Sequence, residues 1–352
     1  MAKAKNRNSV AKHPICSGVK YPSLSDDYAW LDYYELRCLL SRDKILTKGD
    51  IVEDLESIKG VSPHLRLMAS NDSVLDLYED EDEDEDEDDY LEDESDVVGR
   101  KEANARGLIY GISFRKKFFG DWYPFSIRGE EKDEVCLGEL TDKHKLYIQL
   151  LLSSNLRLIP ENRWNEITEP FEAISHKVFT LLMPLGWEVH RFGAKGAVKY
   201  KGSLYNKLSC LAKDIKADFR AKQHYFKKGN NGDGGLDLVA WHPLCDQRSG
   251  IPAAFAQCGC TLDGWPSKSL EASNARLKNI ISPLVPWTTY YFMPHDLLLE
   301  VDGKQDWQRG NDITECIFVD RLRILNLIGF YEIDASSLYS NELVNELLEL
   351  VF

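Results

Sequence analysis

The chain has 352 residues, of which 43% are hydrophobic and 11% aromatic, and this length favours two domains over a single core. No apolar run reaches the roughly 18–20 residues that a membrane helix requires, and the basic N-terminus lacks the apolar segment of a secretory signal. The eight cysteines follow no framework spacing. We therefore expect a cytoplasmic protein with reduced thiols and no membrane partner.

The net charge of −15 comes from one segment of the chain. Residues 79–96 contain fifteen acidic residues and no basic one, so the remainder of the chain is neutral. The negative average therefore does not exclude a nucleic-acid partner. A block of like charge this dense repels itself, and we expect residues 79–97 to form a disordered acidic segment.

The chain before and after this segment reads as a mainly helical N-terminal region. Helical apolar spacing covers residues 30–42 (WLDYYELRCLLSR), and a second short helix is predicted within 46–58 (LTKGDIVEDLESI). After the acidic segment, HKLYIQLLLSSNLRL again has helical spacing. We group residues 1–78 as the first part of this region and residues 98–165 as its continuation.

Residues 166–352 alternate between helical and strand patterns, which predicts an α/β domain with a mixed sheet between helices. The first helix has a cap candidate at Thr168 and Pro170 in its first turn. The predicted elements are helix 168–186, strand 187–193, helix 203–219, strands 236–241 and 253–258, helix 267–281, strand 288–294, and a strand that turns helical within 315–329.

Polar side chains occupy the ends of two adjacent predicted strands. Asp237 lies near the start of one strand and Gln257 near the end of the next, so an antiparallel hairpin brings them side by side. Burying these groups without partners costs a few kcal/mol each. Two oxygen donors suit Mg²⁺, with Mn²⁺ as a substitute, and Glu172 on the preceding helix can supply a third. Asp233 would support the site from the glycine-rich turn.

Other interpretations of these residues remain open. Asp237 alone can be a turn residue, Gln257 a satisfied buried amide and Glu172 an exposed helical residue. Cys258 and Cys260, with Cys245 and His242 nearby, suggest zinc only weakly. Their spacing matches no structural zinc pattern, and free cysteines commonly pack at apolar strand positions.

The order of these motifs resembles the PD-(D/E)xK nuclease superfamily, with its restriction-endonuclease-like fold, and within it the Mrr-like branch. FEAIS supplies Glu172, GGLD supplies Asp237 and AFAQC supplies Gln257, a Gln variant of the third motif, over roughly residues 166–295. The resemblance implies a lysine two positions after Gln257, where this chain has Gly259. Lys268, at the start of the next predicted helix, is the displaced candidate for that role.

The resemblance implies a Mg²⁺-dependent DNA endonuclease that hydrolyses phosphodiester bonds, in a prokaryotic restriction or anti-phage defence system. Other subunits of such a system are expected partners, and a homodimer would let both DNA strands be cut. A second hypothesis is a catalytically inactive nuclease-fold subunit that binds nucleic acid or scaffolds a defence complex. A third is a protein-interaction module in which the nuclease fold is incidental.

A basic stretch immediately precedes the predicted metal site. Residues 191–228 contain eleven Lys or Arg residues and two Asp residues, a net charge of +9. A nuclease needs such a surface to neutralise phosphates, so we expect it to bind DNA. Its basic residues are Arg191, Lys195, Lys199, Lys201, Lys207, Lys213, Lys216, Arg220, Lys222, Lys227 and Lys228.

Overall fold

The computed structural model describes residues 15, 21–22, 27–57, 94–130, 132–193, 197–301 and 304–351. Most of the acidic segment, from residue 79 to residue 93, lies outside these residues. Its last residues do not: α3 begins at Glu94, so residues 94–97 are helical where the sequence predicted disorder.

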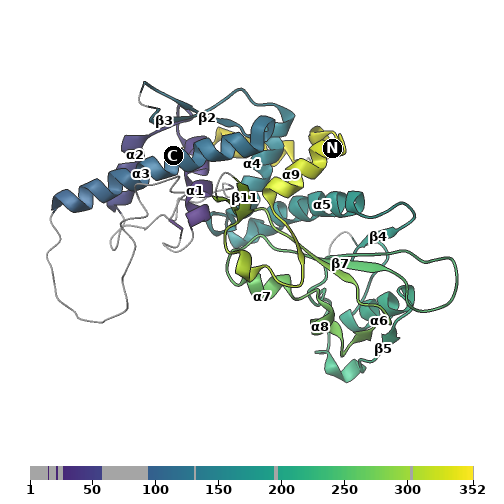
Figure 1. Ribbon diagram of the computed structural model, residues 1–352. Coiled ribbons are helices and arrows are strands. Elements are labelled where there is room, and N and C mark those ends of the chain that lie inside the picture. The colour runs from purple at the N-terminus through teal and green to yellow at the C-terminus, as the bar shows by residue number, and fades with distance from the viewer. Residues whose placement is uncertain are drawn as a thin grey trace, which may run out of the picture.

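The N-terminal half consists of helices and a small antiparallel sheet in the order β1-β3-β2 (Figure 1). Thr141 caps α4 by accepting a hydrogen bond from the backbone N–H of His144, as expected where a polar residue precedes an apolar run. The elements are α1 (Asp27–Leu40), β1 (Ile45–Thr47), α2 (Lys48–Ser57), α3 (Glu94–Phe119), β2 (Phe125–Arg128), β3 (Glu134–Leu137) and α4 (Asp142–Ser154).

The second half is built on a five-stranded mixed sheet in the order β12-β9-β7-β6-β4. Strands β4, β6 and β7 are antiparallel neighbours, whereas β9 runs parallel to β7 and β12 runs parallel to β9. The α/β class and the mixed sheet flanked by helices are therefore confirmed. The strands are β4 (Glu188–Arg191), β6 (Leu238–Trp241), β7 (Ala253–Cys258), β9 (Thr288–Phe292) and β12 (Ile317–Val319).

Helices and smaller strands surround this sheet, and α6, α8 and β5 gather at the end of the molecule remote from α1 and α2 (Figure 1). Two small antiparallel pairs, β5 with β8 and β10 with β11, complete the half. These elements are α5 (Trp164–Leu182), α6 (Leu204–Asp214), β5 (Asp218–Phe219), α7 (Trp265–Ser269), α8 (Asn274–Leu277), β8 (Ile281–Ser282), β10 (Leu298–Val301), β11 (Lys304–Trp307), α9 (Arg321–Phe330) and α10 (Asn341–Glu349).

Three predicted helix boundaries in this half were wrong. Helix α5 begins at Trp164, so Thr168 and Pro170 lie inside it and not at its start. Helix α6 ends at Asp214, because the chain then turns to form β5 against β8. The helix predicted over 267–281 is two short helices, because the Ser273 side chain accepts from the N–H of Arg276 and caps a new one.

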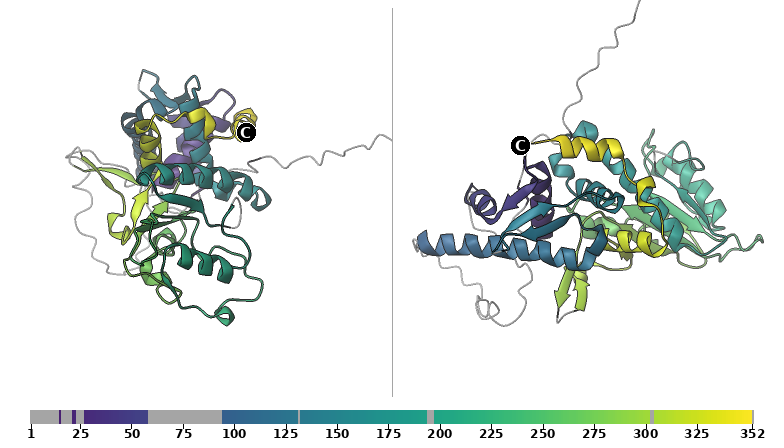
Figure 2. Two further views of the ribbon diagram at one scale, coloured as in Figure 1. Left: turned by 90° about the vertical axis from the view of Figure 1, so that its right-hand side faces the viewer. Right: turned by 90° about the horizontal axis from the view of Figure 1, so that it is seen from above.

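The hydrophobic core continues from the N-terminal helices into the sheet. One cluster of buried side chains includes Trp30 of α1, Phe171 of α5, Ala256 of β7 and Ile324 of α9. Helices α9 and α10 return to pack against α3, α4 and α1, and Figure 2 shows the C-terminal helices among the N-terminal ones. The boundary predicted between residues 165 and 166 therefore falls within a shared core.

A second cluster fills the other side of the sheet, beneath α6. It contains Phe192, Leu208, Val239 and Phe255, whereas Leu238 and Ala256 point to the first cluster. The sheet is thus apolar on both faces, which explains why the sequence of its central strands is continuously hydrophobic. No helix in the described part of the chain is long and apolar enough to cross a membrane.

Four fully buried charged residues join the two halves. Arg115 of α3 lies 2.7 Å from both Asp32 and Glu35 of α1, and Arg321 at the start of α9 lies 2.6 Å from Asp32. All four side chains are at most 1% exposed. The network therefore ties α9, which follows the mixed sheet, to the N-terminal helices.

Candidate functional site

Strands β6 and β7 form the predicted antiparallel hairpin, which brings Asp237 and Gln257 to the same end of it. Leu238 pairs with Ala256 in register, and the N–H of Asp237 also donates to the carbonyl of Ala256, at 3.0 Å. Asp237 and Leu238 thus oppose one residue, which is a β-bulge. The packing of the neighbouring residues is consistent with a bulge. Leu236 and Val239 are three positions apart and would point to opposite faces of a regular strand, yet both lie in the second cluster. The bulge sets the direction of the Asp237 side chain.

The Asp237 carboxylate is partly buried and held by the backbone of β7. Its Oδ2 accepts a hydrogen bond from the N–H of Cys258 at 2.7 Å. Burial raises the pKa of Asp237 well above its usual range, and the neighbouring carboxylates of Asp233, Glu172 and Glu271 raise it further. The hydrogen bond from Cys258 lowers this pKa but does not offset the other effects. Three further carboxylates thus lie within electrostatic reach of Asp237.

The side-chain amide of Gln257, at the same end of the hairpin, has a buried oxygen, Oε1, without a hydrogen-bond partner among the described residues. The adjacent strand contributes a second such atom: Tyr291 pairs in register with Gln257, is fully buried, and its hydroxyl also has no partner in the described part of the chain. Buried polar groups left unpaired cost about 1–3 kcal/mol each, so both atoms mark a place that a ligand or water can satisfy.

Glu172 extends from α5 and pairs with Arg191 of β4, with 3.2 Å between Nη2 and Oε2. Burial raises the pKa of Glu172, and Arg191 lowers it while Asp233 and Glu169 raise it. The structure therefore brings Glu172 within electrostatic reach of Asp237. Its nearest charge partner is an arginine that the sequence assigned to DNA binding.

Gly259 shows why no lysine can stand two positions after Gln257. A Cβ atom built on Gly259 would lie 2.0 Å from the hydroxyl oxygen of Tyr291 and 2.8 Å from its Cζ. Real Cβ atoms do not approach other atoms so closely, and Tyr291 is fixed in a packed cluster with Trp265 and Phe318. The tyrosine occupies the space into which a side chain at 259 would extend.

Lys268, the displaced lysine predicted from the sequence, makes a different contact. Its Nζ donates to Oγ1 of Thr261 at 2.7 Å, between the end of β7 and the start of α7. It lowers the pKa of the Cys260 thiol, which burial, Glu172 and Asp237 raise. Lys268 thus lies beside the site, and its hydrogen bond joins it to the loop and not to Asp237, Gln257 or Glu172.

The donor set fits a hard divalent cation better than zinc. Carboxylate and amide oxygens are the ligands that Mg²⁺ takes. Burial and the nearby charges of Asp237 and Glu172 raise the pKa of Cys258 and Cys260, so a metal would have to displace a proton to bind either thiol. In the described part of the chain no three His, Cys, Asp or Glu side chains stand close enough to hold a metal.

Asp233 and Glu271 complete the surroundings of Asp237. Asp233, predicted as a supporting residue, accepts from the N–H of Gly235 at 2.9 Å and stabilises the glycine-rich turn. Lys207 holds the same turn, because its buried Nζ donates to the carbonyls of Asn231 and Gly232 at 2.9 Å. Sequence reasoning missed Glu271, although its position three residues after Lys268, within one helical turn, was a usable signal.

The basic stretch divides into structural and exposed residues. Arg191 pairs with Glu172, Lys199 with Glu188 and Asp214, Lys207 with the glycine-rich turn, and Lys216 donates to the carbonyl of Pro243 at 2.6 Å. These four, which the sequence assigned to the DNA-binding surface, have internal partners, and Lys195 lies outside the described residues. Lys199 is exposed despite its ion pairs, and so are six others: Lys201, Lys213, Arg220, Lys222, Lys227 and Lys228.

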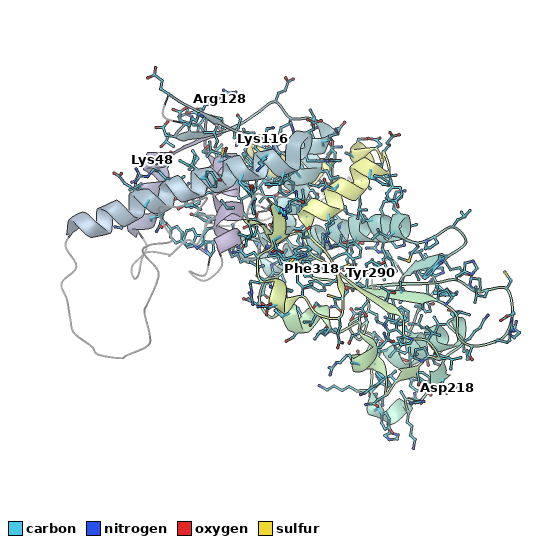
Figure 3. The ribbon with its side chains drawn as sticks, in the orientation of Figure 1. Lys48, Lys116, Arg128, Asp218, Tyr290 and Phe318 are labelled. Atoms are coloured by element: carbon cyan, nitrogen blue, oxygen red, sulfur yellow. The ribbon has the colours of Figure 1, made fainter. Side chains whose placement is uncertain are left out.

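The exposed basic residues lie on the end of the molecule that holds α6 and β5, which Asp218 marks in Figure 3. A cavity of about 340 Å³ lies elsewhere, among α2, α3 and the β2–β3 hairpin, where Lys48 and Arg128 are labelled. That cavity shares no residue with the Asp237 site.

Comparison with family models, with curated proteins and with solved structures gives no match. The function of the chain is therefore inferred from the geometry of the site.

Proposed function

We propose that the protein is a Mg²⁺-dependent phosphodiesterase that acts on DNA, with its cation held at the ends of β6 and β7. The observation that carries this proposal is the unsatisfied Gln257 oxygen at the same end of the β6–β7 hairpin as Asp237, a carboxylate whose pKa is raised. A cation would satisfy both at once. The α/β architecture, with a helix-borne Glu172 facing a mixed sheet, supports a restriction-endonuclease-like fold.

Each residue of the site has a separate role in this proposal. Asp237 and Gln257 would hold the cation, which would neutralise charge at the scissile phosphate and lower the pKa of water. The N–H of Cys258 fixes one oxygen of Asp237, leaving the other oxygen for the ligand. Hydrolysis then forms a bond from the water oxygen to phosphorus and breaks the phosphorus–oxygen ester bond, and the leaving oxygen takes a proton.

The exposed basic residues supply the contacts to the DNA backbone. Lys222, Lys227 and Lys228 flank the short helix Gln223–Tyr225, whose Tyr225 is 61% exposed. Cations beside an exposed aromatic ring suit a phosphate backbone with accessible bases or sugars. These residues immediately precede the glycine-rich turn that leads to Asp237.

Replacing Lys222, Lys227 and Lys228 with alanine should weaken DNA binding and flatten its salt dependence. Each lost phosphate contact lowers the slope of log K against log salt by about 0.9. The measurement is fluorescence anisotropy with a labelled duplex at several salt concentrations. Arg42, Arg128 and Lys132, exposed on the N-terminal half, give a control triple variant with the same charge change. Equal salt slopes in the two triple variants would refute the assignment of this surface.

A second candidate function is a DNA-binding subunit that holds a cation but does not cleave. The filled space at Gly259 and the engagement of Lys268 with Thr261 favour it, because both leave the site without a free lysine. Lysine would otherwise stabilise the charge that develops on the phosphate. The two candidates differ only in turnover.

A cleavage assay distinguishes these candidates. Supercoiled plasmid is incubated with the protein and Mg²⁺ or Mn²⁺, with chelator added in parallel, and Asp237→Asn is compared with wild type. Cleavage that falls by about 10²-fold or more in the variant supports the enzyme. Asp263→Asn, at an exposed position before α7, should cleave like wild type. DNA retention without cleavage supports the second candidate, and neither activity would refute both.

A further inference from the structure

A cavity lies between helices α2 and α3 and the β2–β3 hairpin, in the half of the molecule without the Asp237 site (Figure 1). Its volume of about 340 Å³ is within the range of about 300–1,000 Å³ that is typical of small-molecule pockets. The cavity shares no residue with the Asp237 site or with the exposed basic residues between 201 and 228. It is therefore a separate candidate binding site.

Three cations line this cavity, together with one carboxylate. Lys48 begins α2, Arg106 lies on α3, and Lys132 lies in the turn between β2 and β3. None of the three forms an ion pair with a residue in the described part of the chain. Asp133 is the one acidic residue of the lining, which therefore has a net charge of +2. Like charges gathered around one cavity repel each other, and an anion bound among them would remove this repulsion.

The rest of the lining is mainly apolar. One face of α3 supplies half of the cavity wall, because positions 106, 109, 110 and 113 follow helical spacing. Ile109 is buried, whereas the ring of Tyr110 is 42% exposed and accessible from the cavity. Ile127 of β2 adds a further apolar side chain, and Ser113 adds a hydroxyl group. An accessible aromatic ring beside aliphatic side chains suits a planar or apolar group.

Hydrogen bonds fix the backbone that carries Lys48. Its N–H donates to the carbonyl of Asp133 at 2.8 Å, which joins the start of α2 to the residue before β3. Thr47 and Asp50 form a reciprocal cap at the same place: Oγ1 of Thr47 accepts from the N–H of Asp50 at 3.2 Å, and Oδ2 of Asp50 accepts from the N–H of Thr47 at 2.7 Å. The backbone of the cavity is thus preformed, which lowers the cost of ordering it around a ligand.

A phosphate monoester matches the charge of this lining. It carries about −1.5 to −2 at pH 7, whereas a carboxylate carries a single charge and would leave more of the positive charge unneutralised. We propose that the cavity binds a small phosphorylated molecule with a planar or apolar body, for which a nucleoside monophosphate is a suitable probe. Its phosphate contacts Lys48 and Arg106, and its body stacks on Tyr110 against Ile109 and Ile127.

The test is equilibrium binding of nucleoside monophosphates to the full chain. Adenosine, guanosine, cytidine and uridine monophosphate are each titrated by isothermal calorimetry in chelator, so that no divalent cation at Asp237 contributes. At least one should bind with a Kd below about 1 mM, and the same nucleoside without phosphate should bind at least about tenfold more weakly. Arg106→Gln and Lys48→Gln should each weaken nucleotide binding by about tenfold or more, because each removes a charge-assisted contact.

Arg276→Gln is the matched control. Arg276 is exposed on α8, at the end of the molecule remote from α2 (Figure 1), so this variant should bind within about twofold of wild type. Failure of all four nucleotides to bind at about 10 mM would overturn the proposal, and so would equal affinity in wild type and Arg106→Gln. Thermal unfolding of each variant shows whether it folds. Arg106 is exposed, so Arg106→Gln should unfold like wild type and decides the outcome even if Lys48→Gln is unstable.

Discussion

Replacing Arg321 with methionine is expected to lower the free energy of unfolding by about 3–5 kcal/mol, the largest stability effect that the structure predicts for one substitution. Methionine fills the space but leaves the Asp32 carboxylate without the guanidinium 2.6 Å from it. Asp32 and Glu35 are each at most 1% exposed, so water cannot replace the lost partner.

The pKa of Asp32 also reflects its interaction with the two arginines. Burial alone would raise this pKa, but Arg321 and Arg115 outweigh burial and hold it well below the usual range. A carboxyl with a lowered folded-state pKa stabilises the protein above its ordinary pKa of about 4, and that stabilisation is lost as the pH falls through the folded value. The wild type should therefore lose stability in acid. Arg321→Met should lose less over the same pH range, because part of this stabilisation is already absent at neutral pH.

Urea denaturation of Arg321→Met, at neutral pH and in acid, measures both effects. Arg128→Met is the matched control, because Arg128 is exposed on β2 at the far edge of the N-terminal half (Figure 3). The control should differ from wild type by less than about 0.5 kcal/mol. A loss below about 1 kcal/mol in Arg321→Met would contradict the view that this network joins the two halves.

Asp237→Asn is expected to have the opposite effect on stability while it abolishes metal-dependent cleavage. Burial and the charges of Asp233, Glu172 and Glu271 raise the pKa of Asp237, so its ionised form is unfavourable in the metal-free fold. Asparagine keeps an oxygen to accept from the N–H of Cys258 and removes the charge. We expect a gain of about 0.5–2 kcal/mol at neutral pH, typical of a functional residue replaced by a neutral one.

The pH dependence gives this prediction its sign. Because the folded-state pKa of Asp237 is raised, the folded chain keeps this proton to higher pH than the unfolded chain. Stability should therefore fall as the pH rises from about 4, the ordinary value, through the raised value. Unfolding measured in chelator from mildly acidic to neutral pH should show this fall in the wild type and a smaller one in Asp237→Asn. A variant that is less stable than wild type at neutral pH would refute the electrostatic account.

Much of the second half could be predicted from local pattern. Asp237 and Gln257 flank two short apolar runs joined by a turn-rich loop, and a hairpin is the simplest way to pair such runs. The strand and helix predicted within 315–329 are β12 and α9. The bulge at Asp237 was not predictable, because it is visible only in the register of β6 against β7.

The parts that could not be predicted depend on contacts distant in sequence. Arg321 and Asp32 are separated by 289 positions, and neither lies in a motif. The exclusion of a side chain at Gly259 depends on Tyr291 of a different strand. The sequence likewise shows eleven basic residues in one stretch but not that four of them have internal partners, because charge along a chain carries no information on burial.

The most direct test of the metal site is the stability of the wild type and of Asp237→Asn as a function of Mg²⁺ concentration. A ligand that binds only the folded state stabilises it by RT ln(1 + [L]/Kd), about 2.7 kcal/mol at a hundredfold excess over Kd. The acidic segment 79–96 is common to both proteins, so any cations it attracts affect both equally. We predict that the wild type becomes more stable with rising Mg²⁺ and overtakes Asp237→Asn, which responds little. Parallel curves for the two proteins would contradict a cation site at Asp237.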